Sequence, residues 1–376
     1  MQTLIKASDL ERIGFENGLD AFGIAKAEQF SKTLEILKER KEQGLHAGMN
    51  FTYRNPVRST TPTITMPDAK SLIVGARSYW KPQEGTFDGS DPQGKVALYA
   101  QENYYERLRE GLSAVADELE SKGYRAIILI DDNALVDREA AYQAGLGWYG
   151  KNANILIPKR GSWFVLGSIL TNANFDPNTP IKDNCGPCTK CINACPTEAI
   201  ISPGVIDSNR CLAWLVQSPE DFPPEFREAL GDKIYGCDDC QDICPINKYE
   251  ERVGDLKIRQ SKSSVSIFDI LEQDDETLIT RYGQWYIPQR DPRYLRRNAL
   301  LVLGNIGNTE SEKVQAIVSR YLESPDSMLR SYAVWTAKRL GLINLLTGME
   351  NDGSEDVQRE LALQVRQVNK TPKVKN

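Results

Sequence analysis

All eight cysteines of this 376-residue chain lie between residues 185 and 244, in two runs that each end in Cys-Pro. The first run has the spacing C-x2-C-x2-C-x3-C-P, at Cys185, Cys188, Cys191 and Cys195. In bacterial ferredoxins with this spacing, three thiolates bind one iron-sulfur cluster and the fourth ligates a different cluster. Chance produces such a run very rarely, so the segment from 176 to 250 is predicted to be organised around cofactors.

The second run keeps C-x2-C-x3-C-P but has its first cysteine displaced upstream, which gives Cys211, Cys237, Cys240 and Cys244. Because the fourth cysteine of each run crosses over, the spacing predicts two 4Fe-4S clusters. One would be bound by Cys185, Cys188, Cys191 and Cys244, and the other by Cys195, Cys211, Cys237 and Cys240. The alternatives are a pair of zinc sites, since C-x2-C alone suits zinc, and disulfides, which the cytoplasm disfavours. The Cys-Pro endings favour iron.

The bulk composition is that of a soluble globular protein of two or three domains, with 40% hydrophobic and 26% charged residues. The N-terminus mixes acids and bases and lacks the apolar core of a secretory signal. The longest apolar runs, 126–130 and 163–170, fall far short of the roughly 20 residues that cross a bilayer. A cytoplasmic protein without a membrane segment is expected. The net charge of -6 argues against a uniformly basic surface but leaves room for a local basic patch.

The pattern of helices and strands predicts an α+β fold in three parts. Residues 1–175 read as a mixed α/β domain, residues 176–250 as a ferredoxin-like double-cluster domain, and residues 251–376 as helices resembling HEAT repeats. The last part contains an internal echo, in which residues 296–304 resemble residues 329–337. An ordinary amphipathic helical bundle is the alternative for this part.

Particular elements follow from local signals in the first 175 residues. Ser8 and Glu11 have the spacing of a capping box at a helix start. The elements expected after it are a strand at 20–25, a helix at 103–122, a strand at 126–130, a helix at 137–144 capped by Asp137, and a hairpin of 153–157 with 163–170.

Two features of this region resemble functional motifs without matching their context. Gly145 to Gly150 spells G-x-G-x-x-G, but it ends a helix and leads into a strand, whereas a dinucleotide-binding loop follows a strand and opens a helix. The glycines are therefore interpreted as capping and turn residues. His46 is the only histidine, so neither a His-based triad nor a multi-histidine metal site is expected.

Three acids follow the strand at 126–130, in a position where α/β folds often place chemistry. Asp137 is interpreted as a helix N-cap and Asp132 as a solvated turn residue, which leaves Asp131 as the candidate general acid. Two clusters form a path for electrons, and about 300 further residues exceed what a simple electron shuttle needs. The chain is therefore expected to reduce a substrate.

Taken together, these motifs resemble the epoxyqueuosine reductases. The resemblance rests on Ile130-Asp131, on Asp137-Arg138, on the stretch Ala144-Gly-Leu-Gly-Trp-Tyr-Gly-Lys-Asn152, on the double cluster run and on the helical repeats behind it. It covers nearly the whole chain. The cluster run alone would be shared with ferredoxin-like proteins and with reductive dehalogenases, which the family resembles in its catalytic core.

The resemblance implies an oxidoreductase that removes the epoxide oxygen of epoxyqueuosine at the wobble position of tRNA and gives queuosine. It also implies a cobalamin cofactor, bound without a protein imidazole on cobalt, and an external electron donor. By position, Asp131 matches the proton donor, and the matched cofactor contacts are Arg58, Tyr104, Ile155 and Leu166. Many relatives have Gly-x-Asp-Tyr-His where this chain has Gln101-Glu-Asn-Tyr-Tyr105, so no role of that histidine transfers.

A tRNA substrate needs a binding surface, and the stretch 281–300 is the candidate for the anticodon stem-loop. It interleaves Trp285, Tyr286 and Tyr294 with five arginines, Arg281, Arg290, Arg293, Arg296 and Arg297. Arginines with aromatic side chains suit phosphate contact and base stacking. The alternative for the stretch is an ordinary basic helix face. For the whole chain, the competing functions are a dehalogenase-like reductase of a small molecule and a ferredoxin-type electron-transfer module.

Overall fold

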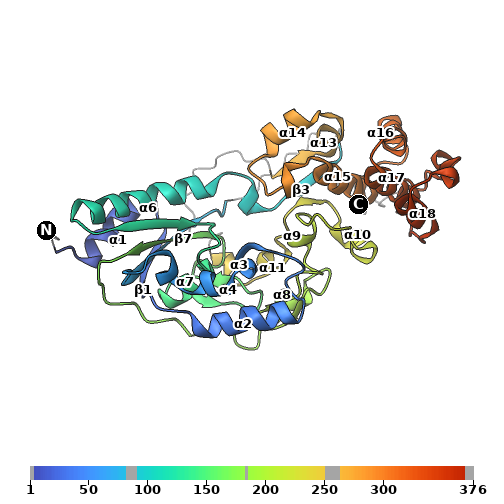
Figure 1. Cartoon of the computed structure of the whole chain (residues 1–376). Helices are drawn as coiled ribbons and strands as arrows, with labels where there is room; N and C mark the ends of the chain where they lie inside the picture. The colour runs from blue at the N-terminus through green and yellow to red at the C-terminus, as the bar shows by residue number, and fades with distance from the viewer. Residues whose placement is uncertain (1–3, 82–90, 183–184, 250–262, 369–376) are drawn as a thin grey trace. The chain divides into compact units, whose positions relative to one another are not determined.

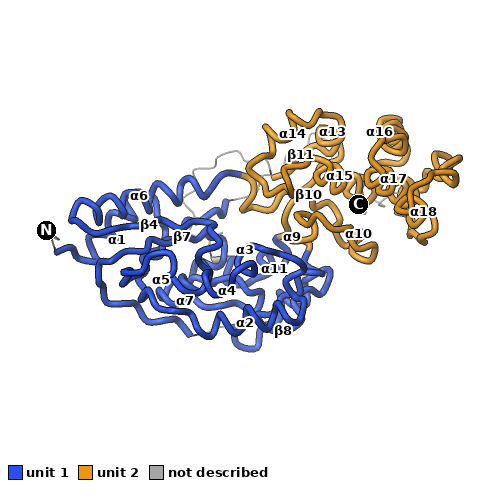
Figure 2. The backbone as a smooth tube through the Cα atoms, viewed as in Figure 1, with its two compact units in different colours: residues 1–82, 102–211, 238–259 blue, residues 83–101, 212–237, 260–376 orange. Residues whose placement is uncertain are grey.

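The computed structural model of the chain describes residues 4–81, 91–182, 185–249 and 263–368. The chain forms two compact units, each assembled from three separate segments (Figure 2). Unit 1 comprises residues 1–82, 102–211 and 238–259, and unit 2 comprises residues 83–101, 212–237 and 260–376. The mixture of helices and strands confirms the α+β fold class. Residues 176–250, expected to form a domain of their own, contribute to both units.

A four-stranded antiparallel sheet forms the centre of unit 1, in the order β1-β2-β7-β4. Its strands are β1 (Ala21–Lys26), β2 (Ser71–Ser78), β7 (Phe164–Thr171) and β4 (Ala126–Ile130). The strands expected at 20–25 and 126–130 are confirmed. The expected hairpin is wrong, because β7 pairs with β2 and β4. The preceding short strand β6 (Ile155–Leu156) pairs instead with β5 (Trp148–Tyr149).

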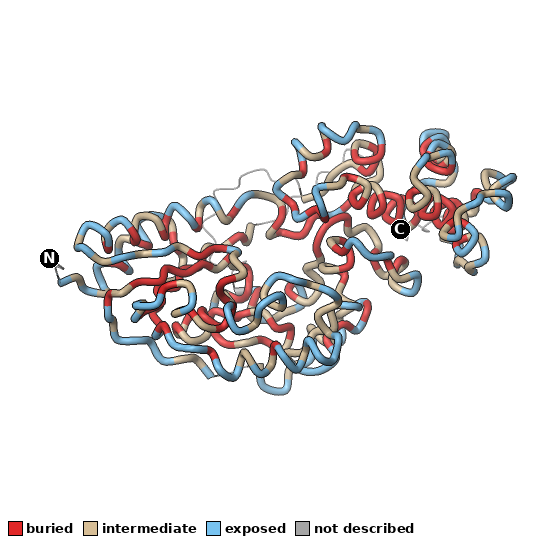
Figure 3. The backbone as a smooth tube through the Cα atoms, viewed as in Figure 1, coloured by how far each residue is buried: buried red, intermediate tan, exposed pale blue. Residues whose placement is uncertain are grey.

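Helices cover both faces of this sheet (Figure 1). Helices α1 (Ala7–Glu16) and α6 (Tyr104–Ser121) cover one face, and α7 (Asp137–Gln143) covers the other. Along β2, Leu72, Val74 and Ala76 join the buried cluster that includes α7. Since successive strand residues point to opposite faces, the residues between them are directed towards α6. Both sets are buried, which explains why the central strands are nearly all apolar (Figure 3).

The predicted capping box at Ser8 is wrong. Helix α1 begins at Ala7 and its N-cap is Lys6, so Ser8 lies inside the first turn and its side chain caps nothing. The remaining helical elements of unit 1 are α2 (Ser31–Glu42), α3 (Phe51–Arg54), α4 (Pro56–Thr60), α5 (Pro62–Thr65), α8 (Lys190–Asn193), α11 (Asp239–Asp242) and η2 (Asn247–Tyr249). A small two-stranded sheet pairs β8 (Ile200–Ser202) with β9 (Val205–Ile206).

Unit 2 combines a small sheet with a series of helices. The sheet has the order β10-β3-β11, formed by β10 (Lys233–Tyr235), β3 (Gln93–Val96) and β11 (Ser264–Ser266). Its shorter helical elements are η1 (Leu98–Ala100), α9 (Leu212–Leu215), α10 (Pro224–Leu230), α13 (Ile267–Glu272), α14 (Asp275–Tyr282), η3 (Pro288–Arg290), η4 (Ile343–Leu346) and η5 (Met349–Asn351). The longer or later helices are α15 (Arg293–Ile306), α16 (Glu312–Leu322), α17 (Ser327–Leu340) and α18 (Glu355–Ala362).

The two segments of the internal echo lie on α15 and α17, which pack directly against each other. Gly304 allows this close approach, because a Cβ atom at this position would lie 2.6 Å from the Trp335 ring. Thr336 of α17 donates a hydrogen bond to the carbonyl of Leu300 on α15, over 2.8 Å. The echo in the sequence therefore corresponds to two helices with a shared interface. Within the described ranges, no helix combines the length and apolar composition needed to cross a membrane.

Candidate functional site

The loop after β4 carries the candidate acid in an uncommon backbone conformation. Asp131 has a φ of 50°, which lies in the left-handed region that side chains other than glycine seldom adopt. Aspartate tolerates this region better than most residues do, but the conformation still costs free energy and is found preferentially at functional sites. Asp131 is also exposed, although the last two residues of β4 before it, Leu129 and Ile130, are buried. The fold thus holds this carboxyl out of the sheet in a strained turn.

The rest of the loop is fixed by hydrogen bonds to α4. The Ser59 hydroxyl donates to the carbonyl of Asn133 over 2.6 Å, and the backbone N–H of Val136 donates to the carbonyl of Ser59 over 2.9 Å. Within the loop, Asp132 Oδ1 accepts from the backbone N–H of Ala134 at 2.8 Å. This last bond agrees with the interpretation of Asp132 as a turn residue.

The environment of the loop favours protonated carboxyl groups. Partial desolvation raises the pKa of Asp131, and the Asp132 carboxylate raises it further. Burial raises the pKa of Asp137 well above the ordinary value, with a smaller contribution from Asp131. The predicted N-cap role of Asp137 is wrong, because Val136 is the N-cap residue and Asp137 is the first residue of α7. Its Oδ1 is buried without a hydrogen-bond partner among the described residues.

The glycine-rich stretch 145–150 has the context expected of it. Gly145, with a φ of 69°, follows the end of α7, and the chain continues into β5.

Residues 151–153, which follow the glycine-rich stretch, contact the first cysteine run, the second cysteine run and α7. Lys151 Nζ donates to the carbonyls of Gly186 and Cys188 over 2.7 and 2.9 Å. Asn152 Nδ2 donates to the carbonyl of Cys240 at 3.3 Å, and the carbonyl of Ala153 accepts from Arg138 NH1 at 3.2 Å. The spacing of this motif did not predict these contacts.

The thiols predicted to bind the first cluster lie within electrostatic reach of one another. Burial raises the pKa of the Cys191 thiol, and the neighbouring thiols of Cys244, Cys185 and Cys188 raise it further. Burial likewise raises the pKa of Cys244, with contributions from Cys185 and Cys188. The structure therefore brings Cys244, about fifty residues later in the chain, to the three cysteines of the first run.

Within unit 1, the fourth cysteine of the first run contacts the segment that carries Cys211. Cys195 Sγ accepts a hydrogen bond from the backbone N–H of Ala199 at 3.2 Å and lies 3.8 Å from Thr197 Oγ1. Thr197 in turn donates to the carbonyl of Arg210 over 2.5 Å. Arg210 directly precedes Cys211, so a single threonine links the neighbourhoods of these two cysteines. Each of the eight cysteines is partly buried.

A buried polar network supports the second cysteine run, and it was not predicted from the sequence. Gln241 Oε1 accepts from Ser162 Oγ at 2.8 Å and from Tyr79 OH at 3.3 Å. Asn247 Nδ2 donates to the Gln241 carbonyl at 2.8 Å, and Asn247 Oδ1 accepts from the Ser162 backbone N–H at 2.7 Å. The available signal was the placement of two amide side chains, Gln241 and Asn247, beside cysteines. Such networks fix the backbone to which they are bonded.

The four predicted cobalamin contacts occupy differing environments. Ile155 is buried and Leu166 is half-buried in the same apolar cluster. Tyr104, at the start of α6, is buried, and its hydroxyl has no hydrogen-bond partner in the described part of the chain. Its ring packs at 5.8 Å from that of Tyr79. Arg58 is exposed on α4, next to the residue that holds the acid loop.

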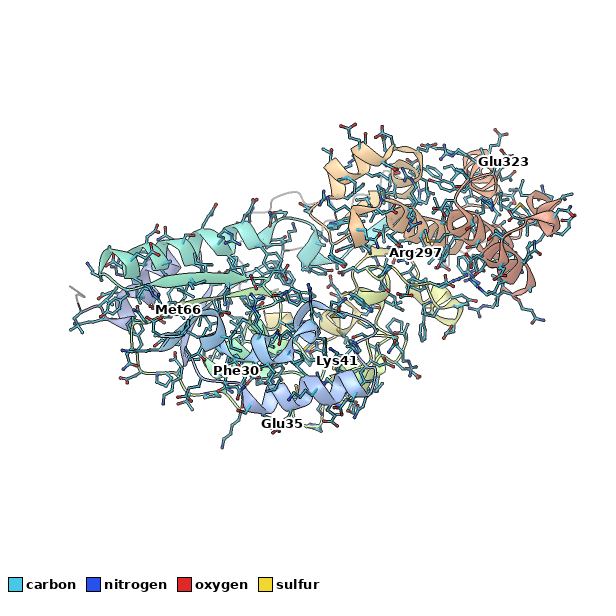
Figure 4. The ribbon with its side chains drawn as sticks, viewed as in Figure 1. Phe30, Glu35, Lys41, Met66, Arg297 and Glu323 are labelled. Carbon is cyan, nitrogen blue, oxygen red and sulfur yellow. The ribbon has the colours of Figure 1, made fainter. Side chains whose placement is uncertain are left out.

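The arginine stretch differs from its predicted role at one position above all. Arg297 is fully buried in unit 2, on α15 (Figure 4). Its guanidinium donates to the carbonyls of Ser218, Glu220 and Leu215 over 2.9, 2.8 and 3.2 Å. The prediction that Arg297 binds tRNA phosphates is therefore wrong, because the side chain is buried and bonds to carbonyls of α9 and of the loop that follows it.

The other arginines of the stretch are engaged to different degrees. Arg296 is 13% exposed and pairs with Asp275, and Arg293 pairs with Asp291 and Asp326. Arg281 is exposed and pairs with Asp269 at 3.0 Å. Arg290 is exposed, with a φ of 55°, and its side chain donates a long hydrogen bond of 3.4 Å to the Gly283 carbonyl. Of the three aromatic residues, Trp285 and Tyr294 are buried, and Tyr286 is 58% exposed.

Comparisons with known proteins agree with this site. Residues 184–247, which contain all eight cysteines, match the model of the 4Fe-4S double cluster binding domain. The epoxyqueuosine reductase of Bacillus cereus is 31% identical over 357 residues, which cover 92% of each chain. A structure of the Bacillus subtilis epoxyqueuosine reductase, in which the catalytic aspartate loop is swung out of the active site, is 26% identical with a TM-score of 0.84. Another epoxyqueuosine reductase structure, bound to an epoxyqueuosine-modified stem loop of tRNA-Tyr, is 26% identical with a TM-score of 0.80. Each of these two structures is matched over 94% of this chain and 96% of its own.

Proposed function

The chain belongs to the epoxyqueuosine reductase family, and we propose that it reduces epoxyqueuosine to queuosine at the wobble position of tRNA. The observation that carries the proposal is the extent of the likeness, which covers 92% of this chain and 92% of the relative and includes the double-cluster segment. Removal of the epoxide oxygen as water consumes two electrons and two protons. A reductase for this reaction needs an electron path and an acid, and unit 1 offers candidates for both.

Asp131 is the proposed acid. It would donate a proton to the epoxide oxygen as the first C–O bond breaks, so that the opened ring carries a hydroxyl group rather than an alkoxide. The second proton is needed when the second C–O bond breaks and the oxygen leaves as water. The raised pKa of Asp131 supports this role, because a carboxyl must hold a proton near neutral pH to act as an acid. Its strained turn supports it as well, and the Bacillus subtilis relative has its catalytic aspartate on a loop that can leave the active site.

The eight cysteines would hold two 4Fe-4S clusters with crossed ligation. The mutual influence of the Cys185, Cys188, Cys191 and Cys244 thiols supports the first set, and the Thr197 link supports the proximity of Cys195 and Cys211 in the second. The donor set of thiols is what such clusters require. An external protein or small molecule would supply the electrons. The enzyme would act in the cytoplasm, where it would meet both this donor and its tRNA.

The residues matched to cobalamin contacts fit a large ligand with apolar and polar faces. Ile155 and the half-buried Leu166 offer an apolar surface. The buried Tyr104 hydroxyl has no hydrogen-bond partner among the described residues, and a ligand amide would provide one. Arg58 would add a positive charge. When bound, cobalamin would supply a reducing cobalt centre that accepts electrons one at a time and delivers them to the substrate.

We further propose the finer division of the chain that the sequence suggested. Residues 1–175 would bind cobalamin and the modified base, residues 176–250 the clusters, and the HEAT-like helices within 251–376 the anticodon stem-loop. The exposed Arg281, Arg290 and Tyr286 are the members of the arginine stretch that suit contact with RNA.

Turnover of an anticodon stem-loop carrying epoxyqueuosine tests the function. The protein, reconstituted with cobalamin and supplied with a chemical reductant, should convert the stem-loop to a product lighter by one oxygen atom in mass spectrometry. Release of halide from aryl halides without conversion of the stem-loop would favour a dehalogenase-like reductase. A visible spectrum without bound cobalamin, combined with reversible cluster reduction, would favour an electron-transfer module.

A further inference from the structure

The segment Lys151–Asn152 contacts both cysteine runs through consecutive side chains. Lys151 donates to the carbonyls of Gly186 and Cys188, in the run assigned to the first cluster. Asn152 donates to the carbonyl of Cys240, which belongs to the second cluster in the crossed assignment. The two side chains differ in one chemical respect that matters to a redox centre, since lysine brings a positive charge and asparagine does not.

The position of Lys151 is fixed by its own backbone. Its carbonyl accepts from the backbone N–H of Gly204 at 2.9 Å, and the Gly204 carbonyl accepts from Arg40 NH2 at 2.9 Å. Lys151 itself is half-buried, so its ammonium group is less screened by water than that of an exposed lysine. Two carbonyl oxygens at 2.7 and 2.9 Å then determine where the charge lies.

A positive charge beside a cluster acts on the two oxidation states unequally. Reduction adds one electron to the cluster, so the reduced state carries more negative charge and is stabilised more by a nearby cation. Charge and hydrogen bonds near the sulfurs are among the factors that set cluster potentials. We propose that Lys151 is a positioning residue that raises the reduction potential of the cluster ligated by Cys185, Cys188, Cys191 and Cys244. This inference rests on the cluster assignment made in the proposed function.

The test is a potentiometric titration of the intact protein, with both clusters followed by electron paramagnetic resonance. Lys151→Gln keeps an N–H donor for the carbonyls but removes the charge. It should lower the potential of one cluster by about 59 mV, which corresponds to an equilibrium shift on the order of tenfold for one electron. Lys151→Arg keeps the charge and should restore the potential to near the native value. The second cluster should titrate as in the native protein in both variants.

Lys190→Gln is the matched control, because Lys190 lies within the first cysteine run but is exposed to solvent. An unshifted potential in Lys151→Gln would overturn the inference, and so would an equal shift in Lys190→Gln. If Lys151→Gln binds less iron, the potential of Lys151→Arg decides, because a value far from the native one would also overturn it. Native protein that contains about eight iron atoms and converts the stem-loop, while Lys151→Gln titrates normally, would refute this inference and leave the proposed function intact.

Discussion

The acid loop of unit 1 and the arginine stretch of unit 2 differ in how many of their charged side chains already bond to other groups of the protein. In the acid loop, Asp131 is exposed and strained, and the half-buried Asp137 has a buried oxygen without a hydrogen bond in the described part of the chain. In the arginine stretch, Arg297 donates three hydrogen bonds to backbone carbonyls and Arg296 pairs with Asp275. The acid loop therefore has carboxyl groups that remain available for chemistry. In the arginine stretch, most guanidinium groups already bond to other residues of unit 2.

This difference shows which sequence signals report function. A cysteine spacing describes ligands that must converge on one cofactor, so it constrains geometry directly. A count of arginines does not say which way each side chain points. On a helix, neighbouring residues such as Arg296 and Arg297 lie about 100° apart, and here only the first reaches the surface at all.

The largest effects are expected at the crossing cysteines. Cys244→Ala should remove the cluster whose other ligands lie in the first run, and Cys195→Ala the cluster whose other ligands lie in the second. Each variant should retain about four iron atoms in place of about eight and should lose turnover. Iron analysis and electron paramagnetic resonance check this. Stoichiometric zinc with little iron in the native protein, or loss of only the run's own cluster, would contradict the crossed ligation.

Asp131→Asn should have the next largest effect. The change preserves shape but removes the proton, so turnover should fall on the order of 10²- to 10⁴-fold while cobalamin and tRNA still bind. In the native enzyme, turnover should decline as pH rises through the pKa of Asp131, because the acid is then deprotonated. Since that pKa is raised, activity should persist to higher pH than an ordinary carboxyl would allow. A pH–rate profile of native enzyme measures this.

Asp132, and not Asp137, supplies the matched control for the Asp131→Asn experiment. Asp132 accepts a local hydrogen bond and is suited to the comparison, so Asp132→Asn should cost little turnover. Asp137 was predicted to be a helix N-cap, but it is the first residue of α7, and burial and the Asp131 carboxylate raise the pKa of its carboxyl, so it is a poor control. A normal rate in Asp131→Asn together with a large loss in Asp137→Asn would identify Asp137 as the acid.

Local patterns predicted the elements of unit 1 that have strong apolar signals, including β4 and α6. They failed where partners come from distant segments. The pairing of β7 with β2 depends on residues about ninety positions apart, and no adjacent signal reveals it. The contacts of Lys151 and the network around Gln241 were missed for the same reason. Their acceptors include backbone carbonyls, and a sequence does not show which carbonyl a side chain will reach.

Arg297→Met should mainly reduce stability. The variant leaves the carbonyls of Ser218, Glu220 and Leu215 without their donor in a buried site, which should lower the free energy of unfolding by at least about 2 kcal/mol. Urea unfolding followed by circular dichroism checks this. Binding of the stem-loop by the folded variant should keep its native salt dependence. A flatter salt dependence with unchanged stability would return Arg297 to the RNA-binding surface.

The smallest effect is expected at Arg290, and it separates surface charge from structural charge within the same stretch. The Arg290 side chain is exposed, and among the described residues its one hydrogen bond is the long one to the Gly283 carbonyl, so its removal should cost the fold little. If it contacts a phosphate, Arg290→Gln should weaken stem-loop binding and reduce the slope of log affinity against log salt by roughly 0.7 to 0.9. Arg296→Gln is the matched control, because its charge is already paired with Asp275 and the slope should not change. Equal slopes in Arg290→Gln and the native protein would remove Arg290 from the proposed RNA contacts, and a reduced slope in Arg296→Gln alone would mean that its ion pair opens to bind RNA.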